Sequence, residues 1–269
     1  MRKGLKIGWQ LDAFGMSAAY ARLASDVGLD ALFIQRADFQ EKEEKRRNKE
    51  RIQLWRPFEE SFGSQKEILS VSLNKDYCWF SEFWVDKNYR PGGQGNTPFQ
   101  MDRLREGYNA PEKMRAMRSQ IMRLVDTDIS NHIFIHQGCD FSNTDASINF
   151  KQYDEYLSYW NHHFGDEIEV LYSTPSKYIQ ALRDQNAFRK WPMRKDDFFP
   201  FADDQDAYWS GFFTTRPILK RMDREVGELF HSSLRLHSML VVSTQTSKDD
   251  MQKLRDTHYN VMDNMGILQ

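Results

Sequence analysis

Short apolar runs alternate with amphipathic stretches over roughly the first two thirds of the chain. Apolar runs of about four to eight residues between turn-forming residues are typical of buried strands, and an apolar position every third or fourth residue is typical of helices. The pattern predicts strands at residues 5–11, 31–35, 67–73, 132–137 and 168–172. It predicts helices at residues 17–27, 39–55, 111–125, 150–163 and 176–184. This alternation favours an α/β fold with a parallel sheet covered by helices, as an open sheet or a barrel.

The last part of the chain has a different pattern. Residues 216–242 and 248–264 each have the apolar spacing of one long amphipathic helix, with a polar break at residues 243–247. Two long helices in succession are typical of the beginning of a helical bundle.

Charge and composition argue against several classes of function. The chain has 37 Lys and Arg residues against 39 Asp and Glu residues, so no strong field would recruit nucleic acid or an acidic membrane surface. We find no apolar stretch near the roughly 20 residues of a membrane-spanning helix, and residues 1–12 lack the unbroken apolar core of a signal peptide. Cys78 and Cys139 lie far apart without a CxxC spacing, and we expect both to be unpaired thiols.

Two aspartates stand after predicted strands, where functional side chains of parallel α/β folds gather. Asp12 ends the first strand and Asp140 follows the strand at residues 132–137. Such a pair is the minimum for glycoside hydrolysis, in which one carboxylate attacks the anomeric carbon and the other protonates the leaving oxygen. Each aspartate could instead cap the helix that follows it. A Gly-rich loop at residues 86–100 has the length typical of loops that border a site.

Two other groups contain residue types that bind metals. His162-His163 with Asp166-Glu167 lies at a predicted helix end in a polar loop, and we interpret it as a solvated surface. His132 and His136 share one face of a predicted strand, and we expect buried histidines with satisfied hydrogen bonds.

Six stretches of the sequence carry a resemblance to a known family. Residues 7–17, IGWQLDAFGMS, agree with the signature W-x-x-D-P-F-G-H-S at Trp9, Asp12, Phe14, Gly15 and Ser17. The others follow in the family's order: FIQRADFQ at 33–40, GCDF at 138–141, LYSTP at 171–175, KDDFFPFAD at 195–203 and YWSGFFTTRP at 208–217. These motifs span nearly the whole chain, which therefore resembles the zinc-dependent retaining α-mannosidases of the lysosomal type, glycoside hydrolase family 38.

The resemblance implies roles for five residues. Asp12 would be the catalytic nucleophile and one ligand of Zn²⁺, and Asp140 would be the general acid and base. Phe14 and Trp209 would contact the sugar, and Arg36 would hold the surroundings of the nucleophile.

The resemblance also implies a fold, a partner and a location. Residues 1–206 would form part of a barrel-like β/α domain, and residues 207–269 a segment of a helical bundle. The partner would be a mannose-containing oligosaccharide or glycoprotein of the N-glycan type, in the lumen of the lysosome or vacuole.

The sequence departs from the family pattern at several positions. Ala13 and Met16 replace the proline and histidine of the signature, and Asp76 replaces the histidine of an H-Y-x-P-P segment. The chain has neither the His-x-Asp element before the signature nor the later His-His-Asp-Ala stretch, which provide zinc ligands in the family. We therefore expect a fragment or truncated form of such an enzyme, with its remaining zinc ligands outside this chain. The alternative is an inactive homologue that binds a glycan or a protein through the residues that it retains at the strand ends.

Overall fold

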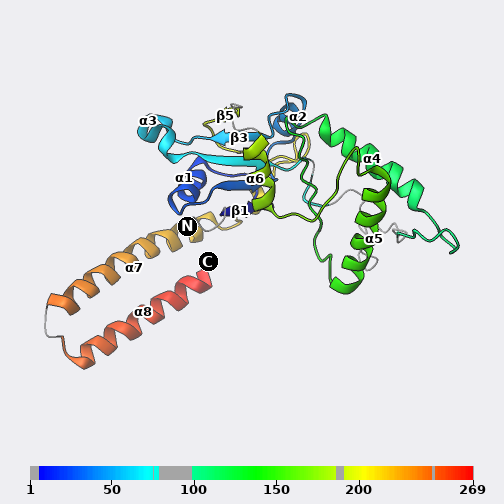
Figure 1. Cartoon of the computed structure of the whole chain (residues 1–269). Coiled ribbons are helices and arrows are strands. Elements are labelled where there is room, and N and C mark those ends of the chain that lie inside the picture. Colours follow the sequence, from blue (N-terminus) through cyan, green and yellow to red (C-terminus); the bar gives the residue numbers. More distant parts are fainter. Residues whose placement is uncertain (1–5, 75, 79–98, 186–190, 244–245, 269) are drawn as a thin grey trace. The chain divides into compact units, whose positions relative to one another are not determined.

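The computed structural model describes residues 6–74, 76–78, 99–185, 191–243 and 246–268. The chain divides into two compact units, residues 1–208 and residues 209–269, and each is described by itself. The first unit contains a sheet with helices and the second a pair of long helices (Figure 1). The predicted loop at residues 86–100 lies almost entirely outside the described residues.

A five-stranded sheet forms the centre of the first unit. Its strands are, in spatial order, β1 (Ile7–Gln10), β2 (Ala31–Ile34), β4 (Ile68–Ser72), β3 (Ile52–Trp55) and β5 (Met193–Arg194). Strands β1, β2 and β4 run parallel, whereas β3 runs antiparallel to β4, and β5 runs parallel to β3. The predicted α/β class is therefore confirmed, with a mixed sheet in place of a fully parallel one.

Strand β3 corrects the prediction of one helix over residues 39–55. Helix α2 (Phe39–Arg47) ends before a turn in which Lys49 takes a positive φ of 58°. Ile52 and Trp55 then lie on β3 with exposures of 1% and 0%. The charged run does form a helix, but the short apolar run after it is a strand that pairs with β4.

The other predicted helices of the first unit are present close to their expected bounds. They are α1 (Ala18–Asp26), α4 (Ala110–Val125), α5 (Ala146–Phe164) and α6 (Pro175–Gln185). Ser17 caps α1, because its side chain accepts a hydrogen bond from the backbone N–H of Ala19 at 3.1 Å. The short helix α3 (Glu59–Phe62) and the 3₁₀ helix η1 (Gly63–Lys66) connect β3 to β4.

No strand forms in residues 132–137 or 168–172, all of which the structure describes, so these two predictions are wrong. Helix α5 explains the second case. Trp160 donates from Nε1 to the backbone oxygen of Ile168 at 2.7 Å, and the Asn161 amide bonds both the N–H and the oxygen of Val170, at 2.9 and 2.7 Å. Side chains of a helix therefore satisfy backbone groups that a neighbouring strand would otherwise satisfy.

Buried side chains form three clusters in the first unit. Alternate residues of a strand point to opposite faces of a sheet, so Leu32 and Ile34 pack on α1 while Ala31 and Phe33 pack on α6. The third cluster lies between α4 and α5, around the fully buried Trp160. Strand β2 is consequently covered on both faces, which fixes the position of the residues at its end.

A buried ion pair joins the sheet to the segment after α4. Arg51 donates from Nη2 to Oδ2 of Asp128 at 2.5 Å, and from Nη1 to the backbone oxygen of Ser72 at 2.7 Å. The Arg51 and Asp128 side chains are 8% and 2% exposed. Burial raises the pKa of Asp128, while the Arg51 charge opposes this shift. Removing either partner would leave an unpaired charge inside the protein.

The second unit is a pair of long helices, α7 (Pro217–Ser243) and α8 (Lys248–Leu268), close to the predicted bounds. The two helices lie side by side (Figure 1). Between them, the ring of Phe230 is 5.5 Å from that of His258. Apolar side chains on this unit are also exposed to solvent, as for Ile267, which is 82% exposed.

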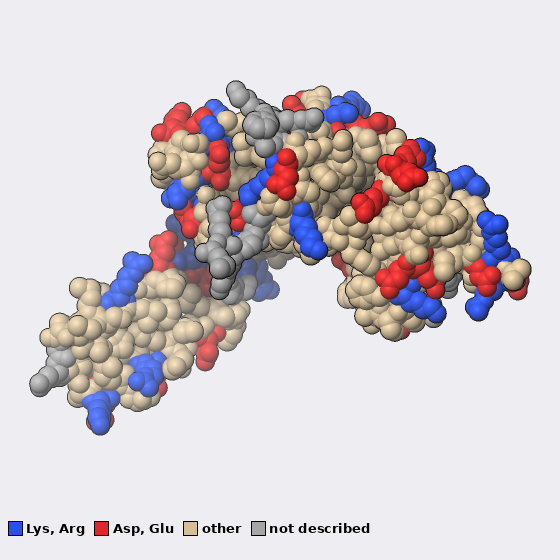
Figure 2. Space-filling model, in the orientation of Figure 1, with Lys and Arg blue, Asp and Glu red and all other residues tan. Residues whose placement is uncertain are grey.

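Acidic and basic side chains are interspersed on the face that Figure 2 shows. This agrees with the near balance of 37 basic and 39 acidic residues. Among the described residues, no helix has the length and apolar character needed to cross a membrane.

Candidate active site

Three neighbouring parallel strands end at the same edge of the sheet, and each is followed by a polar side chain. In the register of β1 and β2, Asp12 and Arg36 occupy equivalent positions, two residues past their strands. Strand β4 pairs in parallel with β2, and the chain continues from it to Tyr77. Functional side chains of α/β folds gather at such strand ends, so this edge is the candidate site.

Arg36 connects the side chains at this edge. Its Nε donates to Oδ1 of Asp12 at 2.6 Å, and its Nη2 donates to the Tyr77 hydroxyl at 3.5 Å. Its guanidinium carbon lies 5.3 to 5.5 Å from the ring centres of Phe14, Tyr77 and Phe201, within the range of favourable cation–π contacts. The Arg36 side chain is 17% exposed and that of Asp12 is 66% exposed. A well-packed cation therefore orients a carboxylate that faces solvent.

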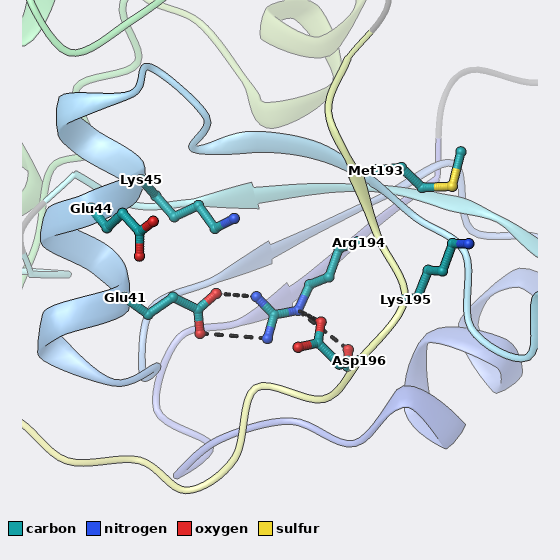
Figure 3. Close-up of a pocket in the computed structure, with 7 residues that line it drawn as sticks. All are labelled: Glu41, Glu44, Lys45, Met193, Arg194, Lys195 and Asp196. Atoms are coloured by element: carbon teal, nitrogen blue, oxygen red, sulfur yellow. Dashed lines mark hydrogen bonds and ion pairs between the residues drawn. The ribbon is translucent and has the colours of Figure 1, made fainter.

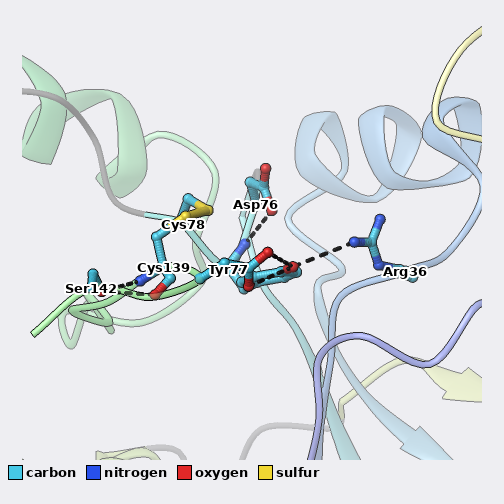
Figure 4. Close-up of a disulfide and its surroundings, with 7 residues drawn as sticks. Arg36, Asp76, Tyr77, Cys78, Cys139 and Ser142 are labelled. Carbon is cyan, nitrogen blue, oxygen red and sulfur yellow. Dashed lines mark hydrogen bonds between the residues drawn. A yellow bond between two sulfur atoms is a disulfide. The ribbon is translucent and has the colours of Figure 1, made fainter. Parts of the chain in front are cut away.

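Asp140 reaches the same group through Tyr77. The Tyr77 hydroxyl lies 3.2 and 3.4 Å from the two carboxylate oxygens of Asp140, to which it donates. On its other side this hydroxyl accepts from Arg36 (Figure 4). The structure therefore links the two predicted carboxylates, Asp12 and Asp140, through two intervening side chains, although the segment that leads into Asp140, residues 132–139, forms no strand.

A disulfide between Cys78 and Cys139 lies beside these contacts and corrects the expectation of two unpaired thiols (Figure 4). Cys78 directly follows Tyr77 in the sequence, and Cys139 directly precedes Asp140. The two Cα atoms are 4.5 Å apart, although 61 residues separate the cysteines in the sequence. Spacing alone did not reveal the pair, because the fold and not the local sequence brings these segments together.

Neither aspartate caps the helix that follows it, which removes the alternative considered for both. Ser17 caps α1, and Asp145 caps α5 by accepting a hydrogen bond from the backbone N–H of Ile148 at 3.2 Å. Asp12 and Asp140 therefore have no capping role in the described part of the chain.

The turn after Asp12 requires glycine at position 15. Gly15 has a φ of 85°, and an added Cβ would come within 2.6 Å of the backbone oxygen of Phe198. Its N–H donates to the backbone oxygen of Arg36 at 3.1 Å, and the N–H of Met16 donates to that of Phe198 at 3.1 Å. The turn is therefore tied to the end of β2 and to the segment after β5, which fixes the backbone that carries Asp12. Met16 is buried, with 6% exposure.

The environment of Tyr77 keeps its hydroxyl protonated. Burial raises the pKa of Tyr77, the charges of Asp12 and Asp140 raise it further, and Arg36 opposes the shift. A neutral phenol can donate its proton in a hydrogen bond to a carboxylate. The negative charges of both Asp12 and Asp140 therefore favour the protonated form of this one hydroxyl.

His136 lies close to the segment that carries Tyr77. Burial lowers the pKa of His136, and hydrogen bonds with backbone groups of residues 76–78 oppose this shift. Its Nε2 has no hydrogen-bond partner among the described residues, and His132 is exposed. The expectation of two buried, satisfied histidines is therefore wrong.

We expect the chain to lose stability as the pH falls below about 6.5, the ordinary pKa of histidine. The folded state holds His136 neutral. Its contribution to the free energy of unfolding is therefore present above the ordinary pKa of histidine and is lost as the pH falls towards the lowered pKa of His136. Thermal unfolding measured between about pH 8 and pH 5 should show a smaller fall for His136→Gln than for the unchanged chain. The matched control is His132→Gln, at an exposed position; an equal pH dependence in the unchanged chain and both variants would contradict this assignment.

Trp209 belongs to the second unit, so it is not among the residues that the first unit brings together. Its ring lies 5.3 Å from that of Phe212. Phe14, by contrast, is half-buried in the first unit, and its ring lies 6.3 Å from that of Phe201. Phe14, one of the two residues expected to contact sugar, lies beside Arg36.

The described residues do not by themselves fit a zinc ion. Zinc in proteins takes about four nitrogen, oxygen or sulfur ligands, and in the described ranges we find no group of three His, Cys, Asp or Glu side chains that could hold a metal. One oxygen of Asp12 accepts from Arg36. His162 and His163 are exposed, and the nearby Glu167 binds Arg118 at 3.0 Å, in agreement with a solvated surface.

A separate hollow lies between α2 and the segment around β5 (Figure 3). Its most buried side chain is that of Arg194, 6% exposed, which pairs with Glu41 and lies 3.5 Å from the ring centre of Phe198. Trp55 donates from Nε1 to the backbone oxygen of Asp196 at 2.9 Å. These contacts hold in place the segment that the Gly15 turn packs against, and so they stabilise the candidate site indirectly. The hollow itself is lined by none of the candidate site residues.

An α/β sheet with one carboxylate, Asp12, at a strand end, linked through Arg36 and Tyr77 to a second carboxylate, Asp140, defines a candidate glycoside hydrolase. Residues 1–204 match the family model for the N-terminal domain of glycosyl hydrolases family 38. The chain therefore belongs to glycosyl hydrolase family 38.

Known relatives are α-mannosidases. The lysosomal α-mannosidase of Dictyostelium discoideum is 31% identical over 98% of this chain and 25% of its own length. An α-mannosidase of Arabidopsis thaliana is 33% identical over 86% of this chain and 22% of its own length. A solved α-mannosidase from Enterococcus faecalis V583 is a more distant likeness, with a TM-score of 0.48 and 12% identity over 71% of this chain and 18% of its own. The chain thus spans a quarter or less of the length of these relatives.

The sequence reasoning missed Tyr77 and the disulfide. A usable indication was present, because each cysteine is the direct neighbour of a polar side chain of the site, Tyr77 in one case and Asp140 in the other. A bond between the two cysteines brings the backbone at Tyr77 close to the backbone at Asp140.

Proposed function

We propose that this chain carries the two catalytic carboxylates of a retaining α-mannosidase, with Asp12 as nucleophile and Asp140 as general acid and base. The observation that supports this most directly is the linked set of contacts from Asp12 through Arg36 and Tyr77 to Asp140. Family membership supports the reaction class, and the motif matches support the roles of the individual residues.

In the proposed first step, an oxygen of Asp12 attacks the anomeric carbon of a terminal α-linked mannose and the glycosidic bond breaks. The Asp140 carboxyl group gives its proton to the leaving oxygen, which leaves a mannosyl ester on Asp12. In the second step, Asp140 takes a proton from water, the water oxygen attacks the anomeric carbon, and Asp12 leaves as a carboxylate. Arg36 orients Asp12 throughout, and the Phe14 ring, beside Arg36, offers an apolar face to the sugar.

The proposed substrates are mannose-containing oligosaccharides or glycoproteins of the N-glycan type, in the lumen of a lysosome or vacuole. The names of the relatives, which include lysosomal α-mannosidases, support this location. The Cys78–Cys139 disulfide supports it independently, because disulfides persist in oxidising compartments and are rare in the cytosol. Zn²⁺ is the proposed cofactor by resemblance, with Asp12 as one of its ligands.

We also propose that residues 1–206 are part of a barrel-like glycoside hydrolase domain and residues 207–269 part of a helical bundle. The α/β sheet of the first unit and the paired helices α7 and α8 of the second support this division.

The stereochemistry of the product tests the proposal. If Asp12 forms a covalent intermediate, hydrolysis of nitrophenyl α-mannoside by the purified chain should release α-mannose first, because two inversions give net retention. Proton NMR of the anomeric signal in the first minutes, before mutarotation, measures this. Initial release of β-mannose would refute the nucleophile role, and no turnover would support either a fragment that lacks part of its site or an inactive homologue.

A further inference from the structure

Two dipeptides carry the contacts around Asp140. Tyr77-Cys78 and Cys139-Asp140 are joined twice, once by the disulfide and once by the hydrogen bonds from the Tyr77 hydroxyl to the Asp140 carboxylate. Ser142 closes the second segment into a turn, since its Oγ accepts from the Cys139 N–H at 2.8 Å and donates to the Cys139 oxygen at 2.7 Å (Figure 4). The covalent bond and the hydrogen bonds thus act between adjacent residues of the same two segments.

Regular secondary structure does not hold Asp140 in place. Residues 132–139 form no helix or strand, and the Asp140 side chain lies in an exposed turn. Asp12, in contrast, follows a strand of the sheet and a turn bonded to β2. An exposed side chain on an irregular segment loses conformational freedom when it is held in one position, so specific contacts must compensate for that loss.

We propose that Tyr77 is a positioning residue for Asp140 and that the Cys78–Cys139 disulfide keeps the two side chains together. The inference rests on the proposed function, in which Asp140 transfers a proton to and from substrate atoms. A hydroxyl within 3.4 Å of both carboxylate oxygens restricts how the carboxyl group rotates. Arg36 in turn holds Tyr77, so the position of the acid and base is coupled to that of the nucleophile.

The cross-link makes this arrangement sensitive to reduction. A dithiol gives two electrons and two protons to the disulfide, which becomes two thiols, and the dithiol itself becomes a cyclic disulfide. Both half-cystines are half-buried, so a small reductant can reach them. Reduction removes the covalent bond between the two irregular segments, while the hydrogen bonds from Tyr77 to Asp140 remain.

The kinetic test uses the purified chain with Tyr77→Phe, with Cys78→Ser plus Cys139→Ser, and with all three changes. Tyr77→Phe should lower kcat about 10- to 100-fold with little change in KM, because it misplaces a proton donor without removing a binding contact. The double variant, Cys78→Ser plus Cys139→Ser, should show a similar fall in kcat, and so should the unchanged chain after reduction. The kcat of the triple variant should be little lower than that of either partial variant, because all three changes disrupt the same contact between Tyr77 and Asp140. The matched control is Tyr172→Phe, which removes a similar hydrogen bond, 2.9 Å long, to Asp154 outside the site.

A second measurement separates this inference from the proposed function, because it needs no turnover. The ring carbon bearing the Tyr77 hydroxyl is observed by NMR at fixed pH, with Tyr77→Phe used to assign it. Asp140→Asn should shift this resonance in the oxidised chain but not in the chain without the two cysteines. Equal shifts in both backgrounds, or no shift in either, would overturn the inference. A disulfide-dependent shift in a chain without turnover would support the contact between Tyr77 and Asp140, while the reaction proposed for the isolated chain would fail.

Discussion

Replacing Asp12 with asparagine is expected to reduce hydrolysis of nitrophenyl α-mannoside by about 10,000-fold or more, the scale seen when other enzymes lose a nucleophile. An amide cannot form the mannosyl ester through which the proposed reaction passes. The change should leave the fold intact, because the Asp12 side chain is 66% exposed and pairs with Arg36 at the surface. Initial rates at saturating substrate measure the effect, and circular dichroism checks the fold.

The control for this prediction is Asp184→Asn, the same chemical change at an exposed position of α6. Asp184 accepts a hydrogen bond from Gln180 at 2.7 Å and contacts none of the candidate site residues. It should keep the full rate. Activity retained in Asp12→Asn would show that another group is the nucleophile.

Replacing Asp128 with alanine is expected to lower the free energy of unfolding by about 3–5 kcal/mol. The change leaves the Arg51 guanidinium, whose side chain is 8% exposed, without its carboxylate partner inside the protein. Urea unfolding followed by circular dichroism measures the loss. Asp126→Ala, two residues earlier at an exposed position, is the matched control and should change stability by less than about 1 kcal/mol.

A second variant tests the cause of that loss. If the unpaired charge is responsible, replacing both partners with apolar residues, Arg51→Met and Asp128→Leu, should recover much of the stability. A loss below about 1 kcal/mol in Asp128→Ala would mean that water reaches Arg51 and that the pair does not hold the sheet to the segment after α4.

Local patterns predicted the parts of the fold that depend on local interactions. The apolar run of β2 and the spacing of α4 are each set within a few residues. The pattern predicted strands wrongly at residues 132–137 and 168–172, because the hydrogen-bond partners of an extended segment are chosen by the tertiary fold. Trp160 and Asn161 of α5 take that role for the second segment.

The candidate site divides in the same way. Asp12 and Arg36 each lie just after one of two paired parallel strands, and the apolar pattern of the sequence had predicted both strands. Tyr77 and the cysteine pair depend on contacts between segments 61 residues apart, which no local pattern encodes. The motif matches singled out Asp140 as a candidate, and only the fold shows which side chains contact it.

Covalent trapping tests the central claim most directly. A fluorinated mannosyl fluoride, whose leaving group is good and whose ring fluorine slows the second step, should leave a stable mannosyl ester on a retaining enzyme. Mass spectrometry of the digested chain should find the added sugar on the peptide that contains Asp12, and on no peptide in Asp12→Asn. A label on another carboxylate, or no label under conditions where the chain hydrolyses nitrophenyl α-mannoside, would contradict the assignment of Asp12 as the nucleophile.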